Sequence, residues 1–192
     1  IMDQFDSFIG LARLNLLAHL PYVLASQGTM LSGRTGIFNL AQEGIMLLGA
    51  SIGFLVALYT KSLLIGSIAA AVVGGLMGLA LAYFSSTLKM DQFVIGLALF
   101  FIGLGASSLA FKLVVGVTLQ LPRVPTLSNL RIPLLGDIPI VGEILFNQNA
   151  LVYFSVLISI ALYYYLYQTS WGLELRAVGE NPKSADSLGV NV

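Results

Sequence analysis

Five apolar stretches, bounded by charged or polar residues, account for most of the chain. They run from Leu14 to Leu31, from Gly44 to Tyr59, from Ser62 to Ser86, from Phe93 to Phe111 and from Ala150 to Tyr167. An α-helix crosses a bilayer in roughly 20 residues, at about 1.5 Å per residue. The last three stretches fit this length, whereas the second is short and predicts a spanning helix that also uses part of the preceding segment. The pattern predicts an all-α, polytopic transmembrane helical bundle.

A short polar segment, the polar island of residues 32–44, separates the first two apolar stretches. It contains three glycines together with Arg34, Asn39, Gln42 and Glu43. Lipid tolerates such a stretch only where protein or water satisfies its polar groups. The polar island is therefore the segment in which we expect a functional site.

Four polar side chains in or near the apolar stretches are candidates for such a site. They are Asn39, Gln42, Glu43 and Gln92, of which the last begins the fourth apolar stretch. Amide groups both donate and accept hydrogen bonds, so these side chains can bind a polar group of either kind. Glu43 is equally consistent with an ion pair to Arg34 that only stabilises the interruption.

Small residues recur every four positions in the second and third apolar stretches, which places them on one helix face. They are Gly49, Gly53 and Ala57 in the second stretch, and Gly66, Ala70, Gly74, Gly78 and Ala82 in the third. Small side chains let helix backbones approach closely, which is a main route to packing in lipid. The pattern predicts close helix–helix contact and by itself indicates no function.

Residues 114–149 differ in composition from the stretches on either side. They contain four prolines and four charged residues: Pro122, Pro125, Pro133, Pro139, Arg123, Arg131, Asp137 and Glu143. Proline interrupts helices, and charge disfavours burial in lipid. We predict an extramembrane loop, with Ile138 to Phe146 at the membrane interface. The loop is either a docking surface or an inert cap over the bundle.

The segment after Gln168 carries the signals of a short, well-ended helix. Asn181 is suited to the N-cap, Pro182 to the first helical position and Gly189 to a left-handed C-terminal residue. A helix of about two turns is too short to be stable alone in water. It therefore needs a partner surface, or else is an interfacial loop.

Composition supports the membrane class and excludes several others. Apolar residues make up 57% of the chain, charged residues 9%, and the mean hydropathy is +0.91, whereas soluble domains have about a quarter of their residues charged. Nine basic and nine acidic residues cancel, which gives no electrostatic case for binding nucleic acid. Cysteine is absent, and the single His19 cannot build a metal site alone. No catalytic constellation stands at helical spacing, so we expect neither a catalytic nor a metal site.

Three segments resemble, in the same order, motifs of bacterial ABC-importer permeases that serve simple sugars, nucleosides and branched-chain amino acids. The segments are Leu20 to Ala50, Lys89 to Leu99 and Thr169 to Pro182. Within the first, Gly36 to Leu40 matches a Gly-hydrophobic-hydrophobic-Asn-Leu run, and Glu43-Gly44 follows it. The nucleoside (basic membrane protein-dependent) branch looks closest, and Ile132 to Phe146 also looks like that branch.

The resemblance implies a multi-pass permease subunit in the cell (inner or plasma) membrane. Such a subunit pairs with a second permease subunit and with cytoplasmic ABC ATPase subunits, and an extracytoplasmic substrate-binding protein delivers the solute. ATP then belongs to the ATPases, and we expect no cofactor in this chain, which has no Gly-x-x-x-x-Gly-Lys-Ser/Thr motif. The resemblance implies that residues 1–192 are one permease domain, with 114–149 extracytoplasmic. It also implies that the polar island is an interrupted helix that lines the translocation path, with Asn39, Gln42, Glu43 and Gln92 as candidates for contact with the solute. The amides of Asn39 and Gln42 suit a nucleobase or ribose hydroxyls. Such permeases continue for several more helices, so we expect the C-terminal helices to be missing.

The resemblance also assigns residues 169–192 to a cytoplasmic coupling region, with Asn181 to Gly189 as the coupling helix. The residues expected to couple the permease to the ATPase are Arg176, Gly179, Glu180, Asn181, Pro182, Lys183, Ala185, Leu188 and Gly189. Ala185 and Leu188 are expected to face an apolar surface of the ATPase, with the charged side chains at its rim.

Two alternatives to a nucleoside permease stay open at this point. One is a permease for branched-chain amino acids or simple sugars, because the polar island contains both charged and neutral polar groups. The other is a non-transporting membrane scaffold subunit, which would not need the segment from Leu173 to Gly189.

Overall fold

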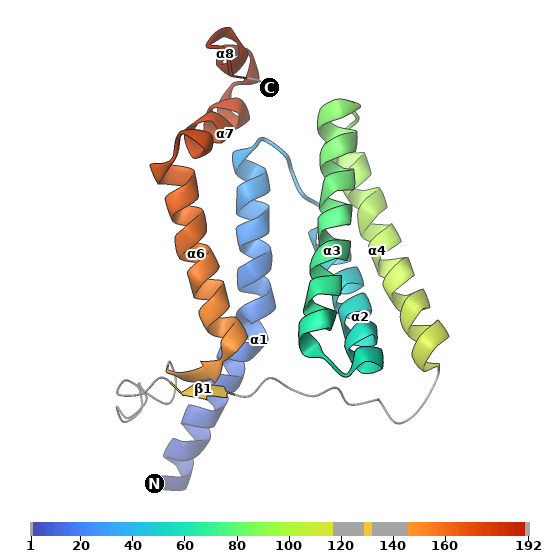
Figure 1. Cartoon of the computed structure of the whole chain (residues 1–192), viewed down its shortest axis with the longest axis vertical. Coiled ribbons are helices and arrows are strands. Elements are labelled where there is room, and N and C mark those ends of the chain that lie inside the picture. Colours follow the sequence, from blue (N-terminus) through green and yellow to red (C-terminus); the bar gives the residue numbers. More distant parts are fainter. Residues whose placement is uncertain (1, 117–128, 132–145, 191–192) are drawn as a thin grey trace. The chain divides into compact units, whose positions relative to one another are not determined.

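The computed structural model describes residues 2–116, 129–131 and 146–190. The elements follow in the order α1 (Met2–Arg34), α2 (Gln42–Thr60), α3 (Leu63–Ala82), the π-helical turn η1 (Tyr83–Thr87), α4 (Gln92–Val115), β1 (Asn129–Arg131), β2 (Asn147–Asn149), α6 (Ala150–Gln168), α7 (Ser170–Glu180) and α8 (Pro182–Ser187) (Figure 1). The chain forms two compact units, one of residues 1–28 and 127–177 and the other of residues 29–126 and 178–192.

Four helices of the described chain are long and apolar enough to cross a membrane. They are Gln42–Thr60, Leu63–Thr87, Gln92–Val115 and Ala150–Gln168. The prediction of an all-α polytopic bundle is confirmed. The first apolar stretch lies within α1, which is 33 residues long and contains Pro21 but is not among these four helices.

Capping side chains explain where the helices α4 and α6 begin. Asp91 caps α4, because its carboxylate accepts hydrogen bonds from the backbone N–H groups of Phe93 (2.9 Å) and Val94 (3.1 Å). Asn149 caps α6 in the same way, through a bond of 3.1 Å from the N–H of Leu151. Such caps satisfy donors that the first helical turn leaves free.

The predicted loop of residues 114–149 needs correction at its start and contains a short sheet. Residues 114 and 115 belong to α4, which runs on to Val115 because its apolar pattern continues past Phe111. Near the other end, β1 pairs antiparallel with β2, with Leu130 opposite Gln148. The four prolines of the loop, and the predicted interfacial segment up to residue 145, lie outside the described residues.

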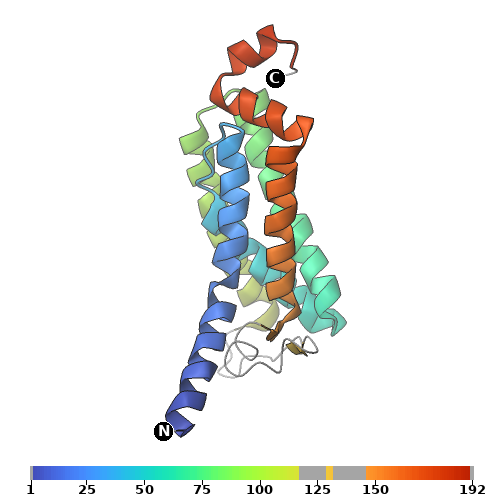
Figure 2. The same ribbon diagram turned by 90° about the vertical axis from the view of Figure 1, so that its left-hand side faces the viewer.

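In the unit that contains β1 and β2, the hydroxyl of Tyr153 ties the two strands to α6. It donates to the carbonyl oxygen of Leu130 (3.2 Å) and accepts from the N–H of Gln148 (3.2 Å). In the same unit α1 and α6 lie side by side (Figure 2), and the amide Nε2 of Gln27 donates to the Ser159 hydroxyl. The bond between Gln27 and Ser159 is an interhelical polar contact of the kind that stabilises helix pairs in lipid.

In the other unit, α2 and α3 pack through the small residues that the sequence singled out. A Cβ built on Gly66 would lie 2.6 Å from the carbonyl oxygen of Gly53 and 2.7 Å from the Cβ of Ala57. One turn further, a Cβ on Gly53 would lie 2.9 Å from that of Ala70. The predicted close contact is confirmed for this half of the stripe. Gly78 has no neighbour within 4 Å of such a Cβ in the part of the chain that the structure describes.

Helix α4 packs against α2 in the same manner, and the two helices run parallel. A Cβ built on Gly44 would lie 2.7 Å from both the Cα and the carbonyl oxygen of Phe100. Further along both helices, the Ser51 hydroxyl donates to the carbonyl oxygen of Ser107 (3.0 Å). Glycine and serine therefore set the distance between α2 and α4.

Replacing Gly66 by alanine should destabilise the protein, because the added methyl meets backbone and a side chain on α2. Overpacking of this kind costs about 1–3 kcal/mol, which exceeds the gain of roughly 1 kcal/mol in helix propensity. The midpoint of thermal unfolding in detergent should fall by several degrees. Gly78→Ala, on the same helix but in open space, is the matched control and should leave the midpoint unchanged or raise it. Equal midpoints for the two variants would contradict the packing described.

Candidate functional site: the break between α1 and α2

Helix α1 ends at Arg34 because Gly36 adopts a left-handed conformation, with φ of +80°. The N–H of Gly36 donates to the carbonyl oxygen of Gly33 (3.1 Å), and the N–H of Ile37 donates to that of Ser32 (3.0 Å). This pair of bonds is a Schellman motif, which favours glycine at the left-handed position. The interruption was predicted from the sequence, but its cause was not. The local signal was present, because a glycine followed directly by an apolar residue is typical of this motif.

Residues 35–41, called the break from here on, connect α1 to α2 without helical structure. The break lies alongside α3 and α4 and not beyond their ends. A Cβ built on Gly96, which lies inside α4, would be 2.8 Å from the Cβ of Leu40. Ala41 is fully buried in a cluster with Leu81 and Ile95. Protein therefore covers the end of the break that leads into α2, whereas Gly36 and Phe38 are exposed.

The amide of Gln92 bonds the backbone of the break at two points. Its Oε1 accepts from the N–H of Phe38 (2.9 Å), and its Nε2 donates to the carbonyl oxygen of Gly36 (3.4 Å). Gln92 is the first residue of α4, where the Asp91 cap fixes the helix start. The sequence placed Gln92 among the candidates for contact with a solute, whereas the structure gives its amide two partners within the chain.

Asn39 and Gln42 are brought together at the start of α2. The Nδ2 group of Asn39 donates to the Oε1 atom of Gln42 (3.1 Å), and both residues are half-buried. The Oδ1 atom of Asn39 is buried and has no hydrogen-bond partner among the described residues. A buried acceptor left unpaired costs about 1–3 kcal/mol, so this atom is ready to receive a donor.

Glu43 lies in the first turn of α2 and is exposed. A carboxylate at that position interacts favourably with the positive end of the helix dipole. Arg34, on the other side of the break, is exposed as well. The ion pair between Arg34 and Glu43 stays a prediction.

The end of α7 lies directly against the break. A Cβ built on Gly179 would overlap the carbonyl oxygen of Arg34 and lie 3.1 Å from the backbone nitrogen of Gly36. Reciprocally, a Cβ on Gly36 would lie 3.4 Å from the carbonyl oxygen of Gly179. Backbone therefore meets backbone at this point, and two glycines permit the approach. The sequence selected Gly179 for coupling, but nothing in it indicated that Gly36 is the contact.

Helix α8 has the ends that the sequence predicted. The side chain of Asn181 accepts from the N–H of Ser184 (3.1 Å), and Pro182 is the first helical residue. Gly189, with φ of +84°, closes the helix in a second Schellman motif, in which its N–H and that of Val190 donate to carbonyl oxygens of the last turn. The predicted N-cap and the left-handed Gly189 are confirmed.

The outward side chains of the coupling region differ partly from the expectation. Leu188 is 85% exposed, whereas Ala185 is buried within the chain, so Ala185 is not available to face a partner surface. Glu180 and Lys183 are exposed. The guanidinium of Arg176 lies 4.8 Å from the centre of the Tyr167 ring, a cation–π distance, and is half-buried.

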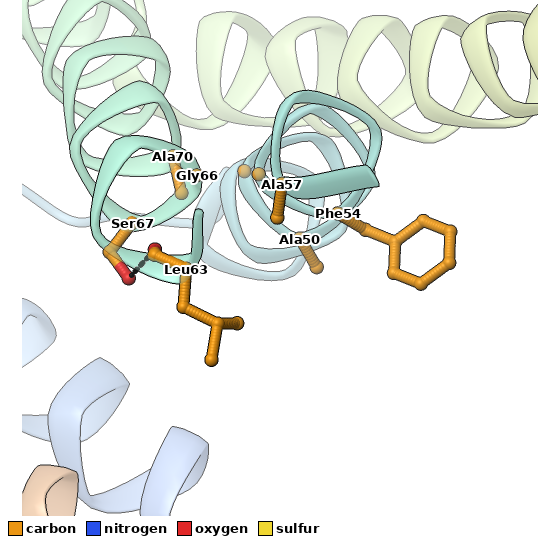
Figure 3. Close-up of a pocket in the computed structure, with 9 residues that line it drawn as sticks. Ala50, Phe54, Ala57, Leu63, Gly66, Ser67 and Ala70 are labelled. Atoms are coloured by element: carbon orange, nitrogen blue, oxygen red, sulfur yellow. Dashed lines mark hydrogen bonds between the residues drawn. The ribbon is translucent and has the colours of Figure 1, made fainter. Parts of the chain in front are cut away.

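An open groove of about 230 Å³ lies between α2 and α3, away from the break (Figure 3). Its lining is formed by Gly49, Ala50, Gly53, Phe54, Ala57, Leu63, Gly66, Ser67 and Ala70. The one hydroxyl among these side chains, that of Ser67, already donates to the carbonyl oxygen of Leu63 (2.8 Å). The groove is therefore apolar and offers little to a polar solute.

The fold is that of a polytopic helical membrane protein with a non-helical break between its first two helices. Residues 13–192 match the family described as branched-chain amino acid transport system / permease component, and the chain belongs to this family. The resemblance found in the sequence is thereby confirmed. The family and the four spanning helices place the chain among multi-pass membrane proteins.

Three curated relatives are similar over most of this chain. The guanosine ABC transporter permease protein NupQ of Bacillus subtilis is 34% identical over 183 residues, which cover 90% of this chain and 56% of the relative. The nucleoside ABC transporter permease protein NupC of Lactococcus lactis is 33% identical over 187 residues (92% and 58%). The putative glucose ABC transporter permease protein TsgC13 of Haloferax volcanii is 30% identical over 187 residues (95% and 55%). The chain spans a little over half the length of these relatives, and no solved structure matches it significantly.

Proposed function

We propose that the chain is part of a permease subunit of an ABC importer in the plasma membrane and that its solute is a nucleoside. The observation that carries the proposal is the Asn39–Gln42 amide pair, with its buried and unpartnered Oδ1 atom, on a non-helical membrane segment. That oxygen can accept from a base N–H or a ribose hydroxyl. The names of the two nucleoside permease relatives support the same solute class.

The negative charge of Glu43, just after the break, favours a neutral solute over an amino acid. A zwitterion needs a site for its carboxylate, and the N-terminus of α2 would be the natural one. Glu43 occupies the first turn of that helix and would repel a second carboxylate there. A sugar is neutral too, and the putative glucose permease among the relatives keeps simple sugars as the second candidate.

The coupling region suits an ATPase partner. Helix α8 is stiffened by its cap and its Schellman motif, and Leu188 projects from it with 85% exposure. Leu188 would enter an apolar groove of the ATPase, while Arg176, Glu180 and Lys183 would make contacts around it. ATP hydrolysis would then take place on the ATPase subunits, with no catalytic step and no cofactor in this chain.

The remaining partners follow from the same assignment. A second permease subunit would complete the path, and a substrate-binding protein would deliver the solute from outside, the side to which the loop after α4 is assigned. In the unit that contains the break, Gly179 contacts Gly36, and Gly36 is bonded to Gln92. Lys89, close to Gln92 in the chain, is therefore at the cytoplasmic end together with α8.

Uptake by the reconstituted importer tests the proposal. Vesicles would hold the full-length subunit, its partner permease and the ATPase, with the binding protein outside and labelled guanosine, glucose or leucine supplied. ATP-dependent uptake of guanosine alone is expected. Asn39→Ala should raise the half-saturating concentration of guanosine about 2- to 10-fold, since one hydrogen bond contributes about 0.5–1.5 kcal/mol.

Ser67→Ala, which removes a hydroxyl from the apolar groove, is the control and should leave the half-saturating concentration unchanged. Uptake of glucose or leucine without guanosine would overturn the solute class. Normal guanosine uptake by Asn39→Ala would show that Asn39 is structural.

Leu188→Ala should weaken attachment of the ATPase, because it removes the most exposed apolar side chain of the coupling helix. Co-purification of the ATPase with the permease should fall, and ATP hydrolysis should no longer rise when loaded binding protein is added. Ser187→Ala, the neighbouring change on α8, should retain both properties. A Leu188→Ala complex with full attachment and full stimulation would contradict the assignment of the coupling helix.

A further inference from the structure

One face of α4 contacts the break and then the start of α2. Gln92, Gly96 and Gly103 are spaced so that they share that face. In chain order they meet Gly36 and Phe38, then Leu40, then Gly44. The first two turns of α4 therefore set the register of the break, and Gln92 is the only one of the three that does so through its side chain.

The chemistry of the Gln92 contact requires a carboxamide. The site presents one N–H, that of Phe38, and one carbonyl oxygen, that of Gly36. A carboxamide supplies one acceptor and one donor at the required separation, whereas a carboxylate supplies acceptors alone and an alkyl group supplies neither. Glutamine is therefore matched to this pair of backbone groups.

The same Gly36 is also the residue against which Gly179 lies. Because this contact is between two backbones, no flexible side chain can absorb a displacement of Gly179. A movement of the coupling region must pass to Gly36, and the hydrogen bonds of Gln92 determine whether the break follows as a unit. Asn39 lies three residues further along that break.

We infer that Gln92 is a positioning residue, which holds the break in register with α4 so that displacement of Gly179 is transmitted to Asn39 and Gln42. The inference rests on the proposed function for its role in transport. It makes no claim that Gln92 contacts the solute. Loss of Gln92 should therefore affect the coupling of transport more than the binding of the solute.

The experiment compares Gln92→Leu, which keeps the side-chain size and removes both hydrogen bonds, with Gln92→Glu, which keeps the acceptor for Phe38. In the complete complex without solute, hydrogen exchange at the Phe38 amide should rise about tenfold in Gln92→Leu, as expected for the loss of one hydrogen bond of ordinary strength. In Gln92→Glu it should change much less. Unchanged exchange in Gln92→Leu would overturn the inference.

A transport measurement distinguishes a positioning role of Gln92 from a role in stabilising the fold alone. Gln92→Leu should lower the number of solute molecules taken up per ATP hydrolysed while the half-saturating concentration stays near the wild-type value. A raised half-saturating concentration with an unchanged ratio would assign Gln92 to the solute instead. Because the exchange measurement needs no solute, it decides the inference even if the importer carries a sugar.

Discussion

The structure depends on satisfying the backbone of the break. The break lacks the continuous hydrogen bonding of a helix, and an N–H or carbonyl group left unsatisfied in lipid would cost several kcal/mol. The chain meets this demand locally through the Schellman motif at Gly36 and at a distance through the amide of Gln92. The side chain of Asn39 is then left with one acceptor free. The interactions that stabilise the break thus leave the Oδ1 atom of Asn39 buried and without a partner in the described part of the chain.

Close helix packing positions Gln92, which is distant from the break in the sequence. Gly44 and Gly103 let the backbones of α2 and α4 meet, and this contact sets where the first turn of α4 lies relative to the break. On the other side of α2, Gly53 and Gly66 do the same for α3. The pattern of small residues identified in the sequence accounts for the contact with α3, whereas Gly44 and Gly103, which position Gln92, lie outside that pattern.

Features that depend on neighbouring residues were predicted from the sequence, whereas contacts between residues far apart in the sequence were not. The spanning helices, the interruption in the polar island and both ends of α8 follow from residues close together in the sequence, such as Asn181, Pro182 and Gly189. The contact between Gly36 and Gly179 joins residues far apart, and no local pattern indicates it. The role of Gln92 was missed for the same reason, since its two partners lie in another segment. The pairing of β1 with β2 likewise depends on residues on either side of a long connection.

Asn39, proposed to contact the solute, and Gly179, proposed to couple to the ATPase, are associated with one short segment. Both lie on or against the same break of seven residues. A short, covered, non-helical segment can change position without disrupting the helices on either side, because its hydrogen bonds are few and specific. This property suits a permease, in which a movement at one membrane face must alter the path for the solute.

The most direct test of the account is the accessibility of the break to water and solute. The chain contains no cysteine, and Phe38 is 65% exposed, so a single Phe38→Cys variant can be labelled in a complex whose partners also lack reactive cysteines. A water-soluble maleimide should modify this cysteine, and a transported nucleoside should slow the modification. Modification by lipid-soluble reagents alone, with no effect of nucleoside, would contradict the account.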